Sequence, residues 1–148
     1  MSQSPQIMES LGRIRRVRFV AQGSRTTGWT GTGSGTVVVS HLPDVIVFNE
    51  SGVWQSDDGR ESGFRNSFRW TWLDPHLRLE HLRFGADQPV WLFDLERVGD
   101  GEWRDVSPHH CREDCYSAEL RIVESEIQVR WTIKGPHKDE RIEYVYSV

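Results

Sequence analysis

Glu50 is the residue best placed for acid–base chemistry in this sequence, because it ends a run of mostly apolar residues. By the alternation of a β-strand, its side chain shares a face with Ile46 and Phe48. A carboxylate on an apolar face is costly unless it is paired. Glu50 is therefore a candidate polar anchor for a ligand, or a general acid or base with a raised pKa. We favour an ion pair at the end of a strand, with an arginine from another expected strand as the partner: Arg16, Arg18 or Arg130.

The densest group of metal-ligating residue types lies at residues 109–115, HHCREDC. Zinc takes four N, S or O ligands, which usually come from two separate chain segments. No second Cys/His pair occurs elsewhere in the sequence, so we expect no metal and interpret the segment as a polar loop followed by a strand. His110 and the nearby Tyr116 remain candidate acid–base residues together with Glu50.

Two other patterns suggest a nucleotide or nucleic-acid function, but their surroundings argue against it. Residues 31–35, GTGSG, have the composition of a phosphate-binding loop, yet they lead into the apolar run 37–39 rather than a helix. We expect a glycine-rich bend in a strand there. The arginines and aromatics of residues 64–72 could stack on bases, but the net charge of −4 is unfavourable for a nucleic-acid partner.

The composition indicates a small soluble protein. The chain has 148 residues and only 36% hydrophobic content, but it contains seven Trp, six Phe and three Tyr. Each aromatic side chain buries about 150–250 Å², so a few of them can fill a core or line a cavity. No apolar run approaches the roughly 20 residues that cross a bilayer, and residues 1–11 lack a secretion signal. We expect a cytoplasmic protein with reduced cysteines, no cofactor and no membrane partner.

The pattern along the chain predicts one short helix followed by strands. Residues 4–11 are expected to form the helix, with Ser4 as its cap, Pro5 in its first turn and Gly12 as its stop. Short alternating runs separated by Gly, Pro, Asp and Asn then follow, which is typical of an all-β meander. The expected strands are 13–21, 28–40, 45–54, 62–73, 77–84, 89–98, 102–107, 115–123, 126–134 and 139–147. The short run 102–107 can extend a neighbour, which leaves about nine strands.

Even spacing and short loops favour a single domain over residues 1–148, folded as a closed up-and-down antiparallel β-barrel. Closing so long a sheet removes its exposed edges. The apolar faces of the strands should point inward. The aromatic side chains that we expect inside are Phe64, Phe68, Trp70, Trp72, Trp131, Tyr144 and Tyr146.

Four short motifs occur in order along the chain. They are Phe48-x-Glu50-x-Gly52, Phe68-x-Trp70, His110-Cys111-x-x-Asp114-x-Tyr116 and Trp131-x-Ile133-x-Gly135-Pro136-x-Lys138-Asp139. From about residue 12 to the end, the sequence resembles the DUF6314 family, a lipocalin-like (calycin) family found mostly in bacteria. Phe48 departs from this pattern, because the family tends to have Tyr there. The resemblance implies a calycin-type barrel and carries no activity with it.

The expected function is the binding of a small hydrophobic or aromatic molecule inside the barrel, without catalysis. The candidate ligand-binding residues are Arg18, Glu50, Phe68, Trp70, His110, Tyr116, Arg130, Trp131 and Tyr144. We expect Glu50 and residues 110–116 near the mouth of the barrel. One alternative is a barrel enzyme, such as a cyclase or isomerase, that uses Glu50, His110 or Tyr116. The other is a filled barrel that acts through its surface, on a partner or as a homodimer.

Overall fold

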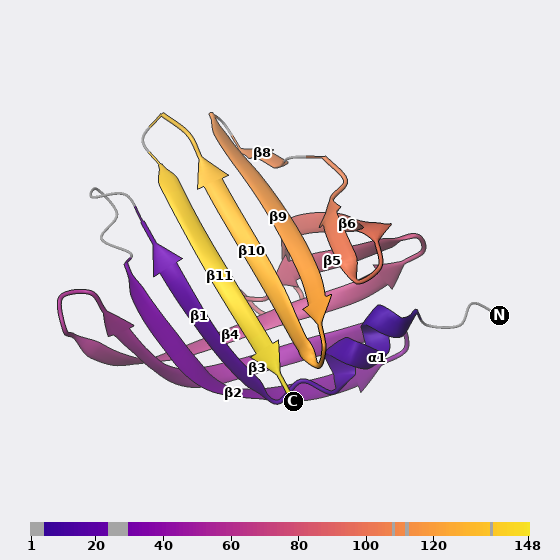
Figure 1. Ribbon diagram of the computed structural model, residues 1–148, viewed down its shortest axis with the longest axis horizontal. Helices are drawn as coiled ribbons and strands as arrows, with labels where there is room; N and C mark the ends of the chain where they lie inside the picture. The colour runs from indigo at the N-terminus through magenta and orange to yellow at the C-terminus, as the bar shows by residue number, and fades with distance from the viewer. Residues whose placement is uncertain (1–4, 24–29, 108, 112, 137) are drawn as a thin grey trace.

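The computed structural model describes residues 5–23, 30–107, 109–111, 113–136 and 138–148 (Figure 1). Within these ranges the chain forms one α-helix and eleven β-strands, and all the strands belong to one antiparallel sheet. The elements in chain order are α1 (Gln6–Gly12), β1 (Arg16–Gln22), β2 (Gly31–Leu42), β3 (Val45–Ser56), β4 (Glu61–Leu73), β5 (His76–His81), β6 (Val90–Gly99), β7 (Glu102–Asp105), β8 (His109–Cys111), β9 (Asp114–Val123), β10 (Glu126–Lys134) and β11 (Asp139–Ser147).

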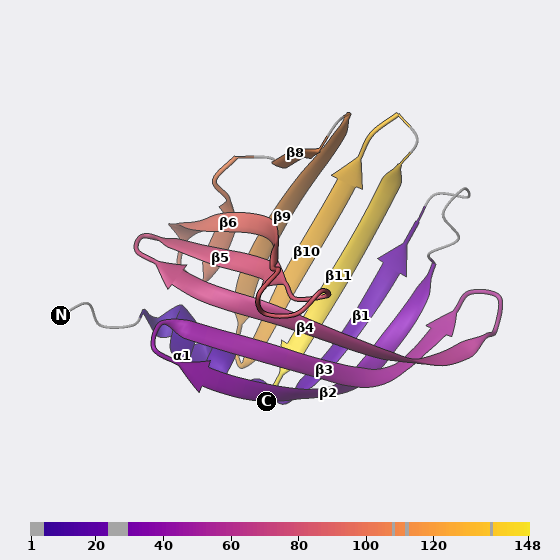
Figure 2. The ribbon, with the colours of Figure 1, turned by 180° about the vertical axis from the view of Figure 1, so that it is seen from behind.

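In the described part of the chain, ten of the strands close into an up-and-down barrel (Figures 1 and 2). Strands β1 to β6 each pair with the next strand along the chain, β7 pairs with β9, and β9 to β11 continue the series. The pairing of β11 with β1 closes the sheet on itself. The short β8 pairs with β9 and lies outside the ring. The expected fold class is confirmed, with ten barrel strands in place of about nine.

The strand boundaries agree best with the sequence near the C-terminus, where β10 and β11 have the bounds expected for them. β5 ends at His81, before the expected residue 84, because Gly85 N–H donates to the Leu82 carbonyl in a turn. β7 is a strand in its own right rather than an extension of β6. The short β8 was not expected. The start of the expected strand 28–40 lies outside the described residues.

Helix α1 begins after Pro5 and includes Gly12, so it starts and ends slightly later than the sequence suggested. The expected cap, Ser4, lies outside the described residues. Ile7, Met8 and Leu11 are buried on one face of the helix and belong to the barrel core. The helix therefore covers the end of the barrel at which the β2–β3 hairpin turns (Figure 2).

The middle of the barrel is filled by large side chains that alternate with exposed ones along each strand. The most deeply buried include Phe48, Trp70, Leu79 and Phe93. At the end away from α1, several inward-facing side chains are only partly buried: Trp54, Phe64, Tyr116, Trp131 and Ile142. Solvent therefore reaches inward-facing aromatic surface at the uncapped end of the barrel.

Residues 31–35 lie in β2, which confirms that they form a strand rather than a phosphate-binding loop. The close approach of neighbouring groups explains the glycines. A Cβ atom on Gly33 would lie 2.2 Å from the ring of Phe19, and one on Gly35 would lie 2.0 Å from the Ser51 carbonyl oxygen. The glycines at the start of β2 therefore leave room for the rings and backbone of the adjacent strands.

Candidate functional site

Glu50 lies in the middle of β3 with its side chain inside the barrel. It pairs with Val37 on β2 and Asn66 on β4, and it is 2% exposed. The Tyr146 hydroxyl, on β11, donates a 2.7 Å hydrogen bond to Glu50 Oε2. The favoured interpretation of Glu50 as a strand-end ion pair at the barrel mouth is therefore wrong. The strand continues for three more inward positions beyond Glu50, so the carboxyl group lies well inside the barrel.

The three arginines expected to pair with Glu50 lie on the outer face instead. Arg18 reaches Glu126 at 3.6 Å, and Arg130 reaches Glu143 at 3.2 Å. Arg16 is exposed at the start of β1. All three alternate with inward-facing residues on their strands, so the period-2 geometry directs their side chains away from the interior. The structure does not bring Arg18 or Arg130 to the same place as Glu50.

No Lys or Arg is buried with Glu50 among the described residues, so desolvation dominates the electrostatics of this site. Desolvation raises the pKa of Glu50 to about 7, and the hydrogen bond from Tyr146 offsets only part of that rise. Burial, with the nearby Glu50 charge, also raises the pKa values of Tyr144 and Tyr146 above their ordinary range. Both phenols stay protonated at neutral pH. Glu50 is then the group at this site that changes charge near neutrality.

The second oxygen of the carboxyl group, Glu50 Oε1, is buried without a hydrogen-bond partner among the described residues. The indole nitrogens of Trp70 and Trp131 are also buried without a hydrogen-bond partner among the described residues. A buried polar atom without a partner is uncommon in native proteins and costs about 1–3 kcal/mol. The interior therefore has one oxygen and two N–H donors to offer to a molecule that enters it.

Aromatic rings pack against Tyr146, the hydrogen-bond partner of Glu50, and continue toward the uncapped end. Tyr144 and Tyr146 stack with their ring centroids 5.6 Å apart, and Phe48 meets Tyr146 edge-on at 5.0 Å. Tyr144 in turn contacts Phe68 at 6.2 Å and Trp131 at 5.5 Å. The structure thus brings together five of the residues selected from the sequence: Glu50, Phe68, Trp70, Trp131 and Tyr144.

The remaining two candidates lie at the uncapped end of the barrel. Tyr116 is near the start of β9, opposite Ile133 on β10, and is partly buried. The backbone of His110 forms part of β8 and pairs with Cys115, but its side chain lies outside the described residues. The expected mouth region at residues 110–116 thus holds Tyr116 and the β8–β9 hairpin, whereas Glu50 lies deeper.

Tyr146 is the residue that the sequence analysis failed to select. It was expected to face inward with Tyr144, and it does. Its partnership with Glu50 joins residues 96 positions apart, on strands that do not pair directly. Alternation gives the face of a residue, but not the height at which its hydroxyl group meets a side chain across the barrel. One signal in the sequence was available: Glu50 is on an apolar face, and alternation places Arg16, Arg18 and Arg130 on the outer faces of their strands, so its partner had to be another inward-facing polar group.

Two of the sequence motifs meet at the uncapped end. Asp114 lies 3.6 Å from the Lys138 ammonium, and a Cβ atom on Gly135 would fall 2.0 Å from Asp114 Oδ1. The glycine therefore leaves room for the carboxylate of the adjacent strand to reach the β10–β11 turn. This contact holds the turn against the start of β9 and brings the two motifs together.

Comparison with known protein families gives a match that includes both motifs. Residues 12–148 match the family described as "Family of unknown function (DUF6314)". The chain belongs to this family. The match extends over all ten barrel strands, and it confirms the resemblance to DUF6314 seen in the motifs. No curated protein matches the chain.

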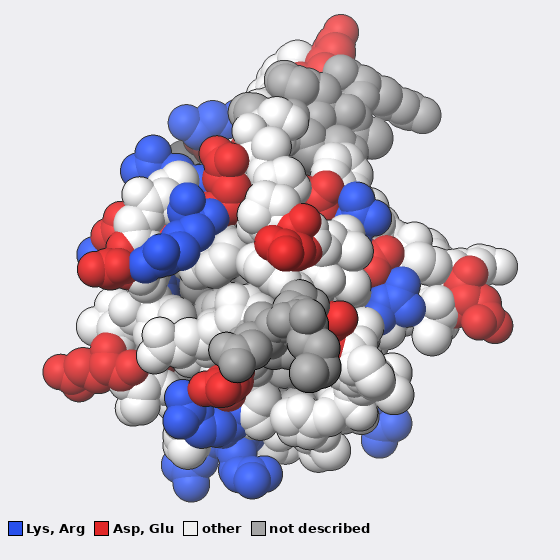
Figure 3. Space-filling view, turned by 90° about the vertical axis from the view of Figure 1, so that its right-hand side faces the viewer, with Lys and Arg blue, Asp and Glu red and all other residues white. Residues whose placement is uncertain are grey.

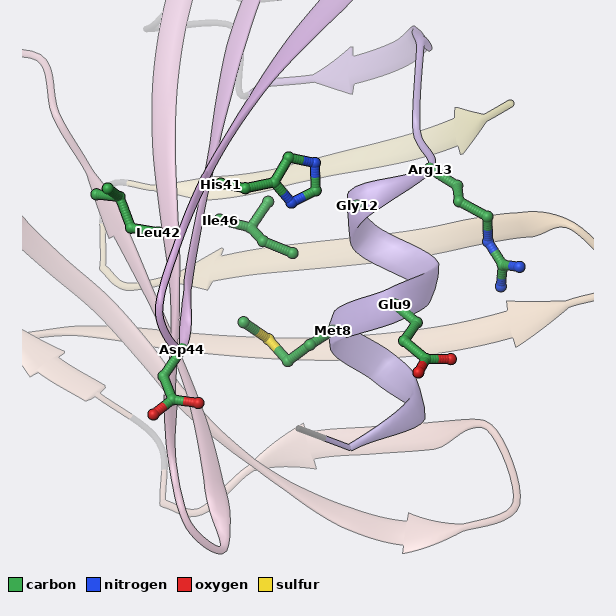
Figure 4. A pocket seen from close by; sticks show the side chains of 8 residues that line it. All are labelled: Met8, Glu9, Gly12, Arg13, His41, Leu42, Asp44 and Ile46. Carbon is green, nitrogen blue, oxygen red and sulfur yellow. The ribbon is translucent and has the colours of Figure 1, made fainter. Parts of the chain in front are cut away.

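A pocket of about 490 Å³ lies outside the barrel of this DUF6314 protein, between α1 and the β2–β3 hairpin (Figure 4). Met8, His41 and Ile46 point into the gap, whereas Glu9 and Arg13 extend from the far side of the helix. Five of its eight lining residues are exposed on the hairpin and helix, and Glu50 does not contribute to it. This pocket is therefore separate from the interior site.

No three His, Cys, Asp or Glu side chains gather as a metal site among the described residues. The side chains of residues 109–112 lie outside them, so the expectation of no metal stays a prediction. In the same ranges, no helix has the length and apolar character to span a bilayer.

The outer surface of the DUF6314 barrel mixes both signs of charge. On the face shown in Figure 3, Lys and Arg lie beside Asp and Glu. Exposed charges also pair across neighbouring strands, as Arg121 on β9 does with Glu102 on β7 at 3.6 Å. Exposed pairs of this kind contribute little to stability, about 0–1 kcal/mol each. They keep the outer face polar and leave the interior as the distinctive chemical environment.

Proposed function

We propose that this protein binds a small molecule with an apolar or aromatic body inside its barrel, with Glu50 as the polar anchor. The observation that carries the proposal is the unpartnered Glu50 Oε1, buried among stacked rings. A few convergent polar groups in an aromatic cavity are typical of small-molecule sites. A bound molecule that hydrogen-bonds to this oxygen would remove the cost of leaving it unsatisfied.

The size of the barrel supports the same proposal. A barrel of about eight strands is just wide enough for side chains to fill it or for one small ligand, and the diameter grows with strand number. This barrel has ten strands. Its up-and-down topology and its interior lined with aromatic side chains are the features for which we propose a lipocalin-like use of the fold.

Binding is expected to be visible through the tryptophans that line the interior. We expect the neutral apolar fluorophore N-phenyl-1-naphthylamine to quench tryptophan fluorescence and to gain emission by energy transfer. Trp131→Ala should weaken its binding about tenfold or more, because Trp131 contacts Phe68, Phe93 and Tyr144 inside the barrel. The measurement is a fluorescence titration of the wild type and the variant.

Trp91→Ala is the matched control for this experiment. Trp91 pairs with Glu80 on the outer face and donates a 3.2 Å hydrogen bond to Asp94. Its removal should leave the affinity for the fluorophore unchanged. Equal affinities for all three proteins would place the fluorophore outside the barrel and contradict the proposal, and no binding at all would favour a filled barrel that acts through its surface.

A proton-transfer enzyme is the second candidate, because the pKa of Glu50, at about 7, suits a general acid or base. A cyclase or isomerase would use Glu50 to move a proton to or from a bound carbonyl compound. In D2O, such an enzyme should exchange the α-hydrogens of a bound ketone for deuterium, and NMR measures the rate of this exchange. Glu50→Gln should abolish that exchange while the ketone still binds. Exchange that persists in Glu50→Gln would exclude this role.

A further inference from the structure

We infer that the molecule bound in the barrel carries a protonated amine on an aromatic or apolar body. This inference rests on the proposed function and names the ligand class of the same site. The features that support it are a buried carboxyl group without a cation, an oxygen of that group without a partner, and aromatic ring faces beside it.

The charge balance of the interior is the first support. Glu50 and Glu80 are the two buried charged residues among those described. Glu80 has a cation, because Arg69 on the adjacent strand lies 3.0 Å away on the outer face. Glu50 has none, since no Lys or Arg is buried in the described part of the chain. The interior therefore lacks one positive charge that a ligand could supply.

The geometry at the carboxyl group favours a donor. Oε2 already accepts the hydrogen bond from Tyr146, whereas Oε1 is free to accept another. An ammonium group brings three donors and a full charge, so it can bind Oε1 and still donate to a phenol oxygen. A hydroxyl group would satisfy Oε1 but would leave the carboxylate charge without a counter-ion.

The rings beside Glu50 suit a cation as well as an apolar body. Tyr144 and Tyr146 stack almost in parallel, with 8° between their planes, and Phe48 meets both Tyr146 and Trp70 edge-on. The faces of aromatic rings attract cations, by about 2 kcal/mol or more when the cation is desolvated. An aromatic body on the ligand would continue this packing toward Phe68.

Binding of such a ligand should depend on pH in one direction. The amine needs ionised Glu50, whose pKa in the free protein is about 7. Affinity should be full at pH 8 and fall about tenfold by pH 6, as the carboxyl group takes up a proton. Tyr144 and Tyr146, which face Glu50 from β11, stay protonated in this range. His81, which stacks on Phe68, is the other nearby titratable group, and burial lowers its pKa.

The inference can be tested with two probes of equal size, 4-phenylbutylamine and 4-phenyl-1-butanol, by calorimetric titration at pH 8 and pH 6. The wild type should bind the amine at least about tenfold more tightly than the alcohol at pH 8. The preference should shrink at pH 6, and binding of the amine there should release protons. Glu50→Gln should remove the preference and its pH dependence but keep the affinity for the alcohol, which also shows that the variant is folded.

Glu80→Gln is the control, since it removes a carboxylate that already has a cation on the outer face. It should preserve the preference for the amine. Equal binding of both probes to the wild type, or a preference that survives in Glu50→Gln, would overturn the amine inference and leave the binding function standing. If neither probe nor the neutral fluorophore binds, the inference and the proposed function both fail.

Discussion

Glu50→Gln is expected to unfold less readily than the wild type at pH 8, by about 2–3 kcal/mol. The wild type holds a buried carboxylate at that pH, whereas glutamine has a similar shape and no charge. The pKa of Glu50 is about 7 in the folded protein and near 4.5 when the side chain is in water. A shift of that size corresponds to about 3 kcal/mol between the two protonation states.

The sign of the pH dependence follows from proton binding. Between pH 4.5 and pH 7 the folded state holds a proton on Glu50 that the unfolded state has lost. The stability that Glu50 contributes is therefore fully present below pH 4.5 and falls by about 1.4 kcal/mol per pH unit up to pH 7. Denaturant unfolding of the wild type and Glu50→Gln at pH 5 and pH 8 measures this pH dependence of the free energy of unfolding. The two proteins have the same titratable groups apart from Glu50, so the contributions of the others cancel. Parallel stability profiles would contradict the burial of Glu50.

Gly35→Ala is expected to destabilise the protein by about 3 kcal/mol, the upper end of the usual overpacking cost. Gly35 on β2 pairs directly with Gly52 on β3. A Cβ atom on Gly35 would lie 2.0 Å from the Ser51 carbonyl oxygen and 2.8 Å from the Gly52 Cα atom. Both are backbone atoms, so no side-chain rotation can relieve the contact. The midpoint of denaturant unfolding measures the loss.

Gly63→Ala provides the control for this substitution. Gly63 is also a strand glycine, on β4, but its nearest neighbour to a Cβ atom is the Gly52 carbonyl oxygen at 3.8 Å. That is an ordinary contact distance, so the change should stay within about 0.5 kcal/mol. Equal effects of the two substitutions would show that β2 and β3 do not approach each other as closely as described.

The fold could be predicted from the sequence where alternation and turn residues agree. β10 and β11 show both, with inward Ile127, Val129 and Trp131 on one side of a Gly135-Pro136 turn, and their bounds were correct. The three-residue β8 was missed because it is too short for a period of two to be visible. The end of β5 was placed too late because Leu82, Arg83 and Phe84 continue the alternation of apolar and polar residues.

The candidate site was predictable in its composition but not in its contacts. Alternation placed Glu50 on the same face as Phe48, and that is correct. It could not show that Tyr146 meets Glu50 across the barrel, because that contact depends on the stagger of strands that do not pair. The preference for an arginine partner failed for a related reason. The strands place Arg18 and Arg130 on the opposite face of the sheet from the carboxyl group.

A crystal structure of the purified protein, with attention to the barrel interior, tests the role of Glu50 as an anchor most directly. We expect electron density for an atom that is not part of the protein, from a retained small molecule or an ordered water, within hydrogen-bond distance of Glu50 Oε1. Tyr146 should donate to the other oxygen of the same carboxyl group. A closed interior in which Oε1 is paired with a protein side chain would contradict the binding site proposed for this barrel.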